Sequence, residues 1–375
     1  MIGSFIRKFI KWFFISLNIL GCIVFLLACL SPFVSPAQWG LSGFLALAVP
    51  YLAVLLIFSV IFWLVAKPVV ALMPIITLLI GFKQLSVAFA WHPLNTFKKE
   101  HTGDSLLRII TWNVRGMYGI SNSSYTQKRN REEIAASVNK LNADIVCLQE
   151  FNSSTANPHE GKNNIALFTG NCPYYFFSRD YNNQNHLYYG GTILFSKYPI
   201  IDTGKIKFPG DYAESLIYTD ILKGKDTIRI FTTHLQSFQF SPDDYANIQK
   251  MKEPDSAVLA ASENIYSKMQ VAFTRRTTQA TLVRANADKS PYPSVICGDF
   301  NDVPNSYTYF HIRGNRQDAF LAASFGLGRS YNAIAPTLRI DYILPDEHFK
   351  INQFDLVDEG LSDHHMLVTD LILKK

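Results

Sequence analysis

Apolar residues are distributed differently in the first hundred residues than in the rest of the chain. Three long apolar runs, residues 10–30, 41–66 and 69–91, are followed by shorter apolar stretches that alternate with polar segments. The first two runs are long enough to cross a bilayer, whereas the third contains Lys83 and Gln84 and is either a tilted span or a partly interfacial helix. We therefore predict a transmembrane region of about three helices over residues 1–91 and contact with the lipid bilayer through residues 10–91.

Residues 92–104 are polar and contain proline and glycine, which predicts a linker to a globular domain over residues 105–375. Basic residues precede the first run, and Lys67 lies between the second and third runs. Because basic residues stay on the cytoplasmic side, three spans would place the domain outside the cytoplasmic membrane. We predict a multi-pass protein of the cell membrane with its domain on the periplasmic or extracellular side. Two spans would reverse this orientation.

The positive charge of the chain belongs to the membrane region. Of 35 basic and 30 acidic residues, seven basic and one acidic lie in residues 1–100, which leaves 28 and 29 for the remainder. The near-neutral remainder argues against a nucleic-acid binder that relies on a broad basic surface. The five cysteines show no spacing typical of a zinc site or a disulfide framework, so they are interpreted as core residues.

The domain begins with a strand–helix–strand pattern. Residues 106–112 and 144–150 have strand character, and residues 128–142 carry apolar positions at helical spacing between them. This order predicts two parallel neighbouring strands whose carboxyl ends share one edge of a sheet. Two further strands, 215–222 and 227–233, predict a hairpin, and residues 241–286 predict helices with a solvated charged face.

Polar residues follow the apolar strands of this domain. Residues 294–297 form a short apolar strand, after which Gly298 is predicted to break the run and Asp302 to act as a turn former. Asp341 lies inside the apolar segment 338–344, where an unpaired carboxylate is costly. The collected polar positions are Asn113, Glu150, His234, Asp299, Asn301, Asp341, Asp363 and His364.

The chemical types of these side chains indicate a metal-dependent reaction. Carboxylate and amide oxygens without a thiolate suit a hard divalent cation, Mg²⁺ or Mn²⁺, better than zinc. A cation together with imidazoles and carboxylates suits hydrolysis of a phosphate ester, in which the cation and histidine neutralise the phosphate and a base activates water.

Six short motifs occur in an order that resembles the endonuclease/exonuclease/phosphatase family of DNase I-like metal-dependent phosphoesterases, here in a membrane-anchored form of bacterial type. The motifs are Thr111-Trp-Asn-Val114, Leu148-Gln-Glu150, Thr233-His-Leu235, Gly298-Asp-Phe-Asn301, Arg339-Ile-Asp-Tyr342 and Ser362-Asp-His364. The resemblance covers residues 106–373. It implies a four-layer α/β sandwich, in which two packed mixed sheets are flanked by helices.

The resemblance also implies roles for the site residues. Glu150 would be the main metal ligand, with Asn113 and Asp363 close to the metal. His364 would be the catalytic imidazole, oriented by Asp341, and Asp299 would orient or deprotonate the attacking water. Asn301 and His234 would act in catalysis by binding the phosphate. His365 follows the catalytic position, and the alternation of a strand predicts that it faces the opposite way.

The function predicted from the sequence is a membrane-anchored, Mg²⁺-dependent phosphoric ester hydrolase that cleaves a phosphodiester or phosphomonoester. A membrane anchor and a near-neutral domain favour a phospholipid head group or a small phosphate ester as substrate. The alternatives are a metal-dependent nuclease acting on DNA or RNA and a non-catalytic membrane-anchored binding module. Polar residues are nearly absent from the apolar runs, which argues against a transporter. We predict no protein partner.

Overall fold

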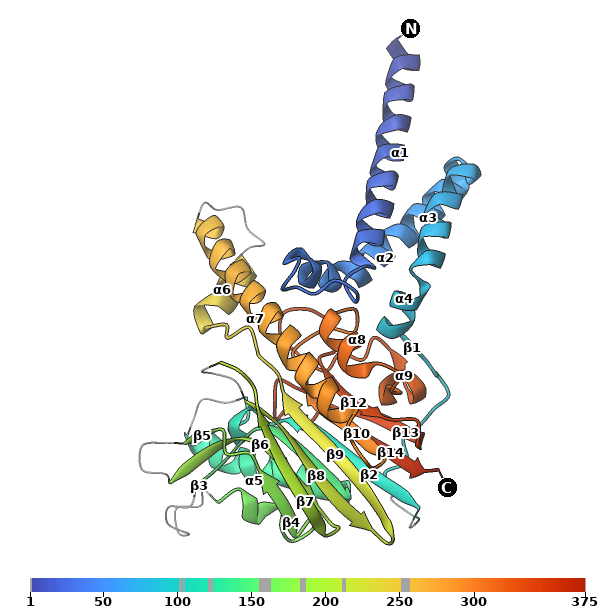
Figure 1. The fold of residues 1–375 in the computed structure, drawn as a ribbon. Coiled ribbons are helices and arrows are strands. Elements are labelled where there is room, and N and C mark those ends of the chain that lie inside the picture. Colours follow the sequence, from blue (N-terminus) through green and yellow to red (C-terminus); the bar gives the residue numbers. More distant parts are fainter. Residues whose placement is uncertain are drawn as a thin grey trace.

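The computed structural model describes residues 2–100, 103, 105–120, 124–154, 163–182, 187–210, 214–250 and 257–374. In it, a group of apolar helices rises from one end of a domain built on two β-sheets (Figure 1). The sequence prediction of a mixed α/β domain preceded by apolar helices is confirmed.

Two of the apolar helices, α1 (Ile2–Ala28) and α2 (Leu41–Ala66), are long and apolar enough to cross a membrane. The third apolar run forms two helices, α3 (Pro68–Ile80) and α4 (Phe82–Ala88), which meet at Gly81 with a bend of 64°. If that bent pair counts as one span, the number of candidate spans is three. Large apolar side chains on α2 are exposed, which is typical of a surface that faces lipid.

The apolar helices are joined to the domain at the end where α1 finishes and α2 begins. The Ser31 hydroxyl donates to the Asn305 carbonyl at 2.8 Å, and the Asn305 amide donates to the Gln84 carbonyl at 2.7 Å. The chain then enters the domain through β1 (Ala90–Trp91), which pairs with β11 (Phe325–Gly326). The last two residues of the predicted transmembrane region therefore form a strand that pairs with a strand of the domain. The predicted domain boundaries at residues 91 and 104 stay a prediction.

The first sheet has seven strands. Its order is β13-β14-β2-β3-β6-β4, with β5 paired to β6, and β2 runs parallel to β3 as the strand–helix–strand pattern predicted. Its other pairings are antiparallel. The strands are β2 (Leu106–Asn113), β3 (Ile145–Ser154), β4 (Tyr174–Phe177), β5 (Tyr181–Asn182), β6 (Tyr188–Ser196), β13 (Phe349–Val357) and β14 (Met366–Leu373).

The second sheet has five strands in the order β12-β10-β9-β8-β7. β8 and β9 form the predicted hairpin, and β10 runs parallel to β9. The remaining pairings, β7 with β8 and β10 with β12, are antiparallel, as is the hairpin. The strands are β7 (Ile200–Lys207), β8 (Ser215–Lys223), β9 (Asp226–His234), β10 (Ser294–Asp299) and β12 (Asp341–Pro345).

Helices cover the outer faces of both sheets, so the domain has four layers (Figure 1). One buried cluster fills the space between the sheets, a second joins the first sheet to α5, and a third joins the second sheet to α7 and α8. The helices of the domain are α5 (Ser124–Lys140), α6 (Pro242–Lys250), α7 (Ala257–Ala287), α8 (Tyr307–Arg313) and α9 (Ala319–Ala323), with short 3₁₀ turns at Arg115–Met117 and Ile165–Leu167.

Several local predictions were wrong. β3 does not end at Glu150 but continues to Ser154. β10 continues through Gly298, and Asp341 opens β12 rather than lying in its middle. Gly298 stays in the strand because β10 approaches β9 closely: its φ is 134°, and a Cβ there would lie 2.0 Å from the Thr233 carbonyl oxygen. Only glycine fits this backbone position.

Candidate active site

The predicted polar side chains gather where strands of both sheets end. In the first sheet, Asn113 ends β2 and pairs with Gln149 of β3, one residue before Glu150. In the second sheet, Asp299 pairs with both His234 of β9 and Asp341 of β12. The two sheets therefore bring residues from opposite ends of the domain sequence to one place.

The backbone at Glu150 aims its side chain into the cleft. Its φ is 49°, and the pairing of β3 with β6 shifts register between Leu148 and Phe151. Such a bulge turns a side chain away from the regular alternation of a strand. The carboxylate is 41% exposed, and its Oε1 accepts a hydrogen bond of 3.0 Å from the Asn113 amide. Glu150 therefore presents a partly exposed carboxylate that accepts a hydrogen bond from Asn113 on one side.

Asp299 lies at the centre of the site and is completely buried. Its Oδ2 accepts a hydrogen bond of 3.1 Å from the Asn113 amide, and its Oδ1 accepts one of 2.8 Å from the Asn301 backbone N–H. The Asn301 side-chain amide donates to the Leu235 carbonyl at 2.9 Å. Asn301 thus closes the turn after β10, and its side-chain oxygen is the part of this amide left for other partners.

His364 is paired with the buried carboxylate of Asp341. Its Nδ1 lies 3.0 Å from Asp341 Oδ2, and its Nε2 lies 3.7 Å from Asp299 Oδ2. Burial disfavours the imidazolium, but the neighbouring carboxylates of Asp341 and Asp299 outweigh it and raise the pKa of His364 to about 10. Burial raises the pKa of Asp341, and the contact with His364 partly offsets that increase. The pair is therefore an imidazolium and a carboxylate at neutral pH.

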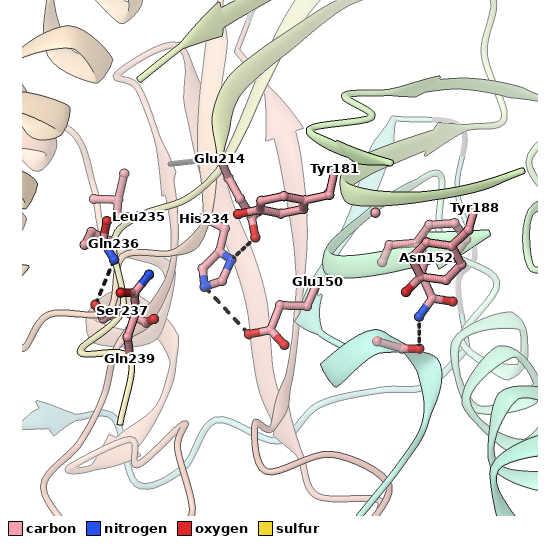
Figure 2. A pocket seen from close by; sticks show the side chains of 14 residues that line it. Glu150, Asn152, Tyr181, Tyr188, Glu214, His234, Leu235, Gln236, Ser237 and Gln239 are labelled. Carbon is pink, nitrogen blue, oxygen red and sulfur yellow. Dashed lines mark hydrogen bonds and ion pairs between the residues drawn. The ribbon is translucent and has the colours of Figure 1, made fainter. Parts of the chain in front are cut away.

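A second pair, of His234 with Glu214, lies opposite the first. His234 Nδ1 lies 2.7 Å from Glu214 Oε1, and its Nε2 lies 3.8 Å from Glu150 Oε1 (Figure 2). The same Nε2 lies 3.6 Å from Asp299 Oδ2. Burial opposes the charge of this imidazole as well, but Glu214, Asp299 and Glu150 together raise the pKa of His234 to about 10. Burial in turn raises the pKa of Glu214.

Glu214 was missed by the sequence analysis. It precedes β8 and is separated from His234 by the length of the β8–β9 hairpin, so no local pattern connects the two residues. Arg115 was missed as well: its Nε lies 3.7 Å from Asp363 Oδ2 at the rim of the site. Both partners of that contact are about one-third or more exposed, so the ion pair itself contributes little to stability.

The interpretation of Asp302 and Arg276 was wrong. Asp302 does not simply form a turn, because its Oδ2 lies 3.2 Å from Nε of Arg276 and both side chains are buried. Arg276 also donates from Nη1 to the Gln236 carbonyl at 2.9 Å. The face of α7 predicted to be solvated therefore anchors the two segments that follow β9 and β10, behind the site. His365, in contrast, contacts Asp358 at 3.3 Å, outside the cluster around Asp299.

Two adjoining hollows meet at Glu150. One, of about 350 Å³, is lined by His234, Glu214 and the tyrosines Tyr181 and Tyr188 (Figure 2). The other, of about 180 Å³, contains Asp299, Asn301, Asp363 and His364 and extends toward the apolar helices. The predicted catalytic and metal-binding side chains thus line these two hollows, with Asn113 and Asp341 in contact with residues that line them.

The donor set fits a hard divalent cation. Asp299, Asp341 and His364 each offer a ligand atom, and these atoms lie within 4.8 Å of one another. Asp341 Oδ1 is buried and has no hydrogen-bond partner among the described residues, which leaves a carboxylate oxygen free to bind a cation. This cluster differs from the ligand set that the resemblance implies, namely Glu150, Asn113 and Asp363. The exposed carboxylate of Glu150 and the oxygen of Asp363 also suit Mg²⁺ or Mn²⁺.

Comparison with known proteins agrees with the fold. The model of the Endonuclease/Exonuclease/phosphatase family matches residues 110–364, and a second model, described only as a domain of unknown function, matches residues 8–88. Among curated proteins, none matches the chain.

Solved structures share the fold at low sequence identity. An endonuclease/exonuclease/phosphatase from Beutenbergia cavernae is 19% identical with a TM-score of 0.50, over 72% of each chain. A mannosyl-6-phosphatase from Bacteroides thetaiotaomicron (15% identity, TM-score 0.48, 71% of this chain and 100% of that one) and TDP2 from Caenorhabditis elegans (16%, 0.48, 71% and 98%) are also similar.

The paired mixed sheets, together with the family match, define the class as that of the phosphoesterase fold. The chain belongs to the Endonuclease/Exonuclease/phosphatase family, whose members are divalent-metal-dependent hydrolases of phosphate esters.

Proposed function

We propose that this protein is a membrane-anchored, Mg²⁺- or Mn²⁺-dependent phosphoric ester hydrolase. One observation carries the proposal: the Nε2 atoms of His234 and His364 lie 3.6 and 3.7 Å from the same oxygen, Asp299 Oδ2, and each imidazole is backed by a buried carboxylate. The two positively charged imidazole rings beside one buried carboxylate form a place where a phosphate and a water molecule can be held together.

The residues divide the work of hydrolysis. His234 and His364, both protonated at neutral pH, would bind the non-bridging oxygens of the phosphate and stabilise the charge that develops on them. Asp299 would accept a hydrogen bond from the attacking water and orient it in line with the leaving group. Asn301 would add a polar contact to the phosphate. Asp341 and Glu214 would keep the two rings in place and charged.

The cation would be held by Glu150, with Asn113 and Asp363 nearby, and the carboxylates of Asp299 and Asp341 beside His364 are the second place for it. When bound, a divalent cation neutralises phosphate charge and lowers the pKa of bound water. Asn113 donates to both Glu150 and Asp299, so its amide would keep the two carboxylates at a fixed separation.

The arrangement of the helices supports a proposal for the anchoring and for the side of the membrane on which the domain lies. The domain joins the helices where α1 ends and α2 begins, so residues 31–40 lie on its side of the membrane. Arg7, Lys8, Lys11 and Lys67 lie toward the opposite ends of α1 and α2. Since basic residues favour the cytoplasmic side, we place the catalytic domain outside the cytoplasmic membrane. Protease added to intact cells should then cleave the domain, and resistance until lysis would contradict this placement.

The substrate would be a phospholipid head group or a small phosphate ester. The test uses the full chain in nanodiscs with Mg²⁺ or Mn²⁺ and a panel of bis-p-nitrophenyl phosphate, inositol phosphates, phospholipids, plasmid DNA and abasic DNA. We expect hydrolysis of phosphate esters that is lost in Glu150→Gln and in His364→Asn.

The matched controls are Glu347→Gln and His348→Asn, which change an exposed carboxylate and an exposed imidazole away from the cleft. Both should retain the rate of the unmodified protein. A folded protein that hydrolyses nothing in this panel, or a Glu150→Gln variant with full activity, would overturn the proposal. Cleavage of DNA alone would assign the nuclease function instead.

A further inference from the structure

The wall of the catalytic cleft includes a residue of a membrane-spanning helix. Leu47, in the second turn of α2, lines the same hollow as Asp299 and His364. Its neighbour Ala46 is completely buried against Val303 and Ile340 of the catalytic domain. The helix therefore does more than tether the domain, because its first turns complete the cleft.

The lining of this hollow combines polar and apolar side chains. Its polar part consists of the carboxylates and the imidazole of the candidate site together with Tyr245 and Tyr331, whose hydroxyls lie 2.9 Å apart. Its apolar part consists of aliphatic and aromatic side chains. These side chains are Leu47, Phe238, Phe240, Val303, Ile334, Leu338 and Ile340.

The apolar lining residues are connected by contacts to the place where α2 meets the domain. Phe238 packs edge to face on Phe273 with ring centroids 5.5 Å apart, and Phe273 packs in the same way on Phe44 of α2 at 5.2 Å. On the other side, the hydroxyl of Tyr51 lies 3.1 Å from that of Thr337, which holds the 333–339 loop against the helix. Aromatic packing on one side and this polar contact on the other thus position the cleft beside the span.

The length of α2 places Leu47 at the surface of the bilayer. The helix has 26 residues, which at about 1.5 Å per residue gives about 39 Å, against about 30 Å for a hydrocarbon core. About 20 residues are enough to cross that core, and counting back from Ala66, next to the basic residue Lys67, reaches Leu47. The turns before Leu47 then lie at the level of the lipid head groups.

We propose that the substrate is a phosphate ester of a membrane lipid, taken from the bilayer so that an apolar chain lies against Leu47, Phe238 and Phe240 while the phosphate reaches Asp299 and His364. This inference rests on the proposed hydrolase function and names its substrate class. At about 180 Å³, the hollow is smaller than the 300–1,000 Å³ typical of sites for drug-sized ligands. It therefore takes one chain near its junction with the head group, and the rest of the lipid stays in the membrane.

The test compares each lipid with its own head group. Full-length protein in phosphatidylcholine nanodiscs, with Mg²⁺ or Mn²⁺, is given phosphatidic acid or phosphatidylglycerol, and in parallel glycerol phosphate or glycerophosphoglycerol. We expect the lipid to be hydrolysed at least a hundredfold more efficiently in kcat/KM than its chain-free counterpart. Equal efficiency would overturn the inference and leave the proposed hydrolase function standing. If the protein hydrolyses neither the lipid, nor its chain-free counterpart, nor bis-p-nitrophenyl phosphate, the inference and the proposed hydrolase function are both wrong.

Variants of α2 test where the acyl chain of the lipid lies. Leu47→Trp narrows the cleft and should lower the lipid-to-head-group ratio of kcat/KM at least tenfold, whereas Val54→Trp, on the 52% exposed side chain of Val54 farther along the same helix, should leave the ratio unchanged. A ratio that both variants change equally, or that neither changes, would overturn the assignment of Leu47.

A binding measurement keeps the assignment testable if Leu47→Trp lowers all activity. Phosphatidic acid with a photoactivatable diazirine in its acyl chain, incorporated in the nanodisc, should label the segment containing Phe238 and Phe240. Excess phosphatidic acid should reduce that labelling, and Leu47→Trp should abolish it. Labelling restricted to α1–α4 would show that no chain enters the cleft and would overturn the inference.

Discussion

His364 Nδ1 lies 3.0 Å from Oδ2 of Asp341, a carboxylate whose other oxygen has no partner among the described residues. The contact holds the ring so that its Nε2 faces Asp299. The Ser330 hydroxyl accepts from the Asp341 backbone N–H at 3.1 Å, and the Trp112 indole donates to the His364 carbonyl at 2.8 Å. Both members of the pair are therefore fixed by buried neighbours.

This relationship predicts different losses for the two partners. His364→Asn removes the imidazole itself and should lower kcat by about 10²–10⁴-fold, the range typical of a positioned acid or base. Asp341→Asn leaves the imidazole ring of His364 present but less well oriented, and should lower kcat by about 10–100-fold. Steady-state kinetics on bis-p-nitrophenyl phosphate measures both values. Equal losses would show that Asp341 does more than position His364.

The same pair predicts how stability depends on pH in metal-free protein. Its neighbouring carboxylates raise the pKa of His364 from 6.5 to about 10 despite burial. A raised imidazole pKa means that the pair stabilises the fold fully below about pH 6.5 and loses this contribution as pH rises through about 10. The stability difference between the unmodified protein and His364→Gln, measured by thermal unfolding with EDTA, should therefore shrink from pH 7 to pH 10. A constant difference would contradict the prediction.

Glu214 is predicted to act through His234. Glu214→Gln replaces the carboxylate 2.7 Å from His234 Nδ1 with a neutral amide of the same shape, so the pKa of His234 should fall. Activity above neutral pH should then decline earlier, because less imidazolium is available for the phosphate. NMR titration of the His234 ring, together with the pH profile of kcat/KM, distinguishes this role from a purely structural one. An unchanged ring pKa accompanied by lower activity would indicate general destabilisation.

Metal removal should lower the thermal stability of the unmodified protein and have little effect on a variant that lacks a metal ligand. We expect Mg²⁺ or Mn²⁺ at 100 times its dissociation constant to stabilise the protein by about 2.7 kcal/mol, with EDTA reversing the shift in melting temperature. Glu150→Gln, which removes an accessible carboxylate, should show a much smaller shift, and Glu347→Gln should behave as the unmodified protein. If Glu150→Gln binds normally but Asp299→Asn does not, the cluster around Asp299 and His364 is the metal site.

The buried ion pair of Arg276 and Asp302 predicts a stability effect behind the site. Arg276→Leu leaves a buried carboxylate without its partner and should destabilise the protein by about 3–5 kcal/mol. The change should also loosen Gln236, whose carbonyl accepts from Arg276. Thermal unfolding in detergent measures the loss. The comparable variant Arg284→Leu, of an arginine that is 31% exposed on the same helix, should cost less than about 1 kcal/mol.

Local chain signals allowed much of the fold to be predicted. The strand–helix–strand order around Asn113 and Glu150 predicted their parallel strands, because hydrophobic periodicity and connection length restrict how such a unit folds. The hairpin over residues 215–233 followed from its turn residues. Strands β7 and β13 were missed because half-exposed edge positions weaken the apolar pattern.

The sequence by itself determined which residues have the chemistry for a phosphoesterase site, since carboxylates, amides and imidazoles at strand ends are visible in the chain. Tertiary structure alone decided how they are supported. Glu214 reaches His234, Arg276 reaches Asp302, and Leu47 completes the cleft through contacts between residues distant in sequence. Such contacts depend on how sheets and helices pack, which leaves no periodic signal along the chain. For that reason an apolar run that predicted only an anchor also supplies a wall of the candidate active site.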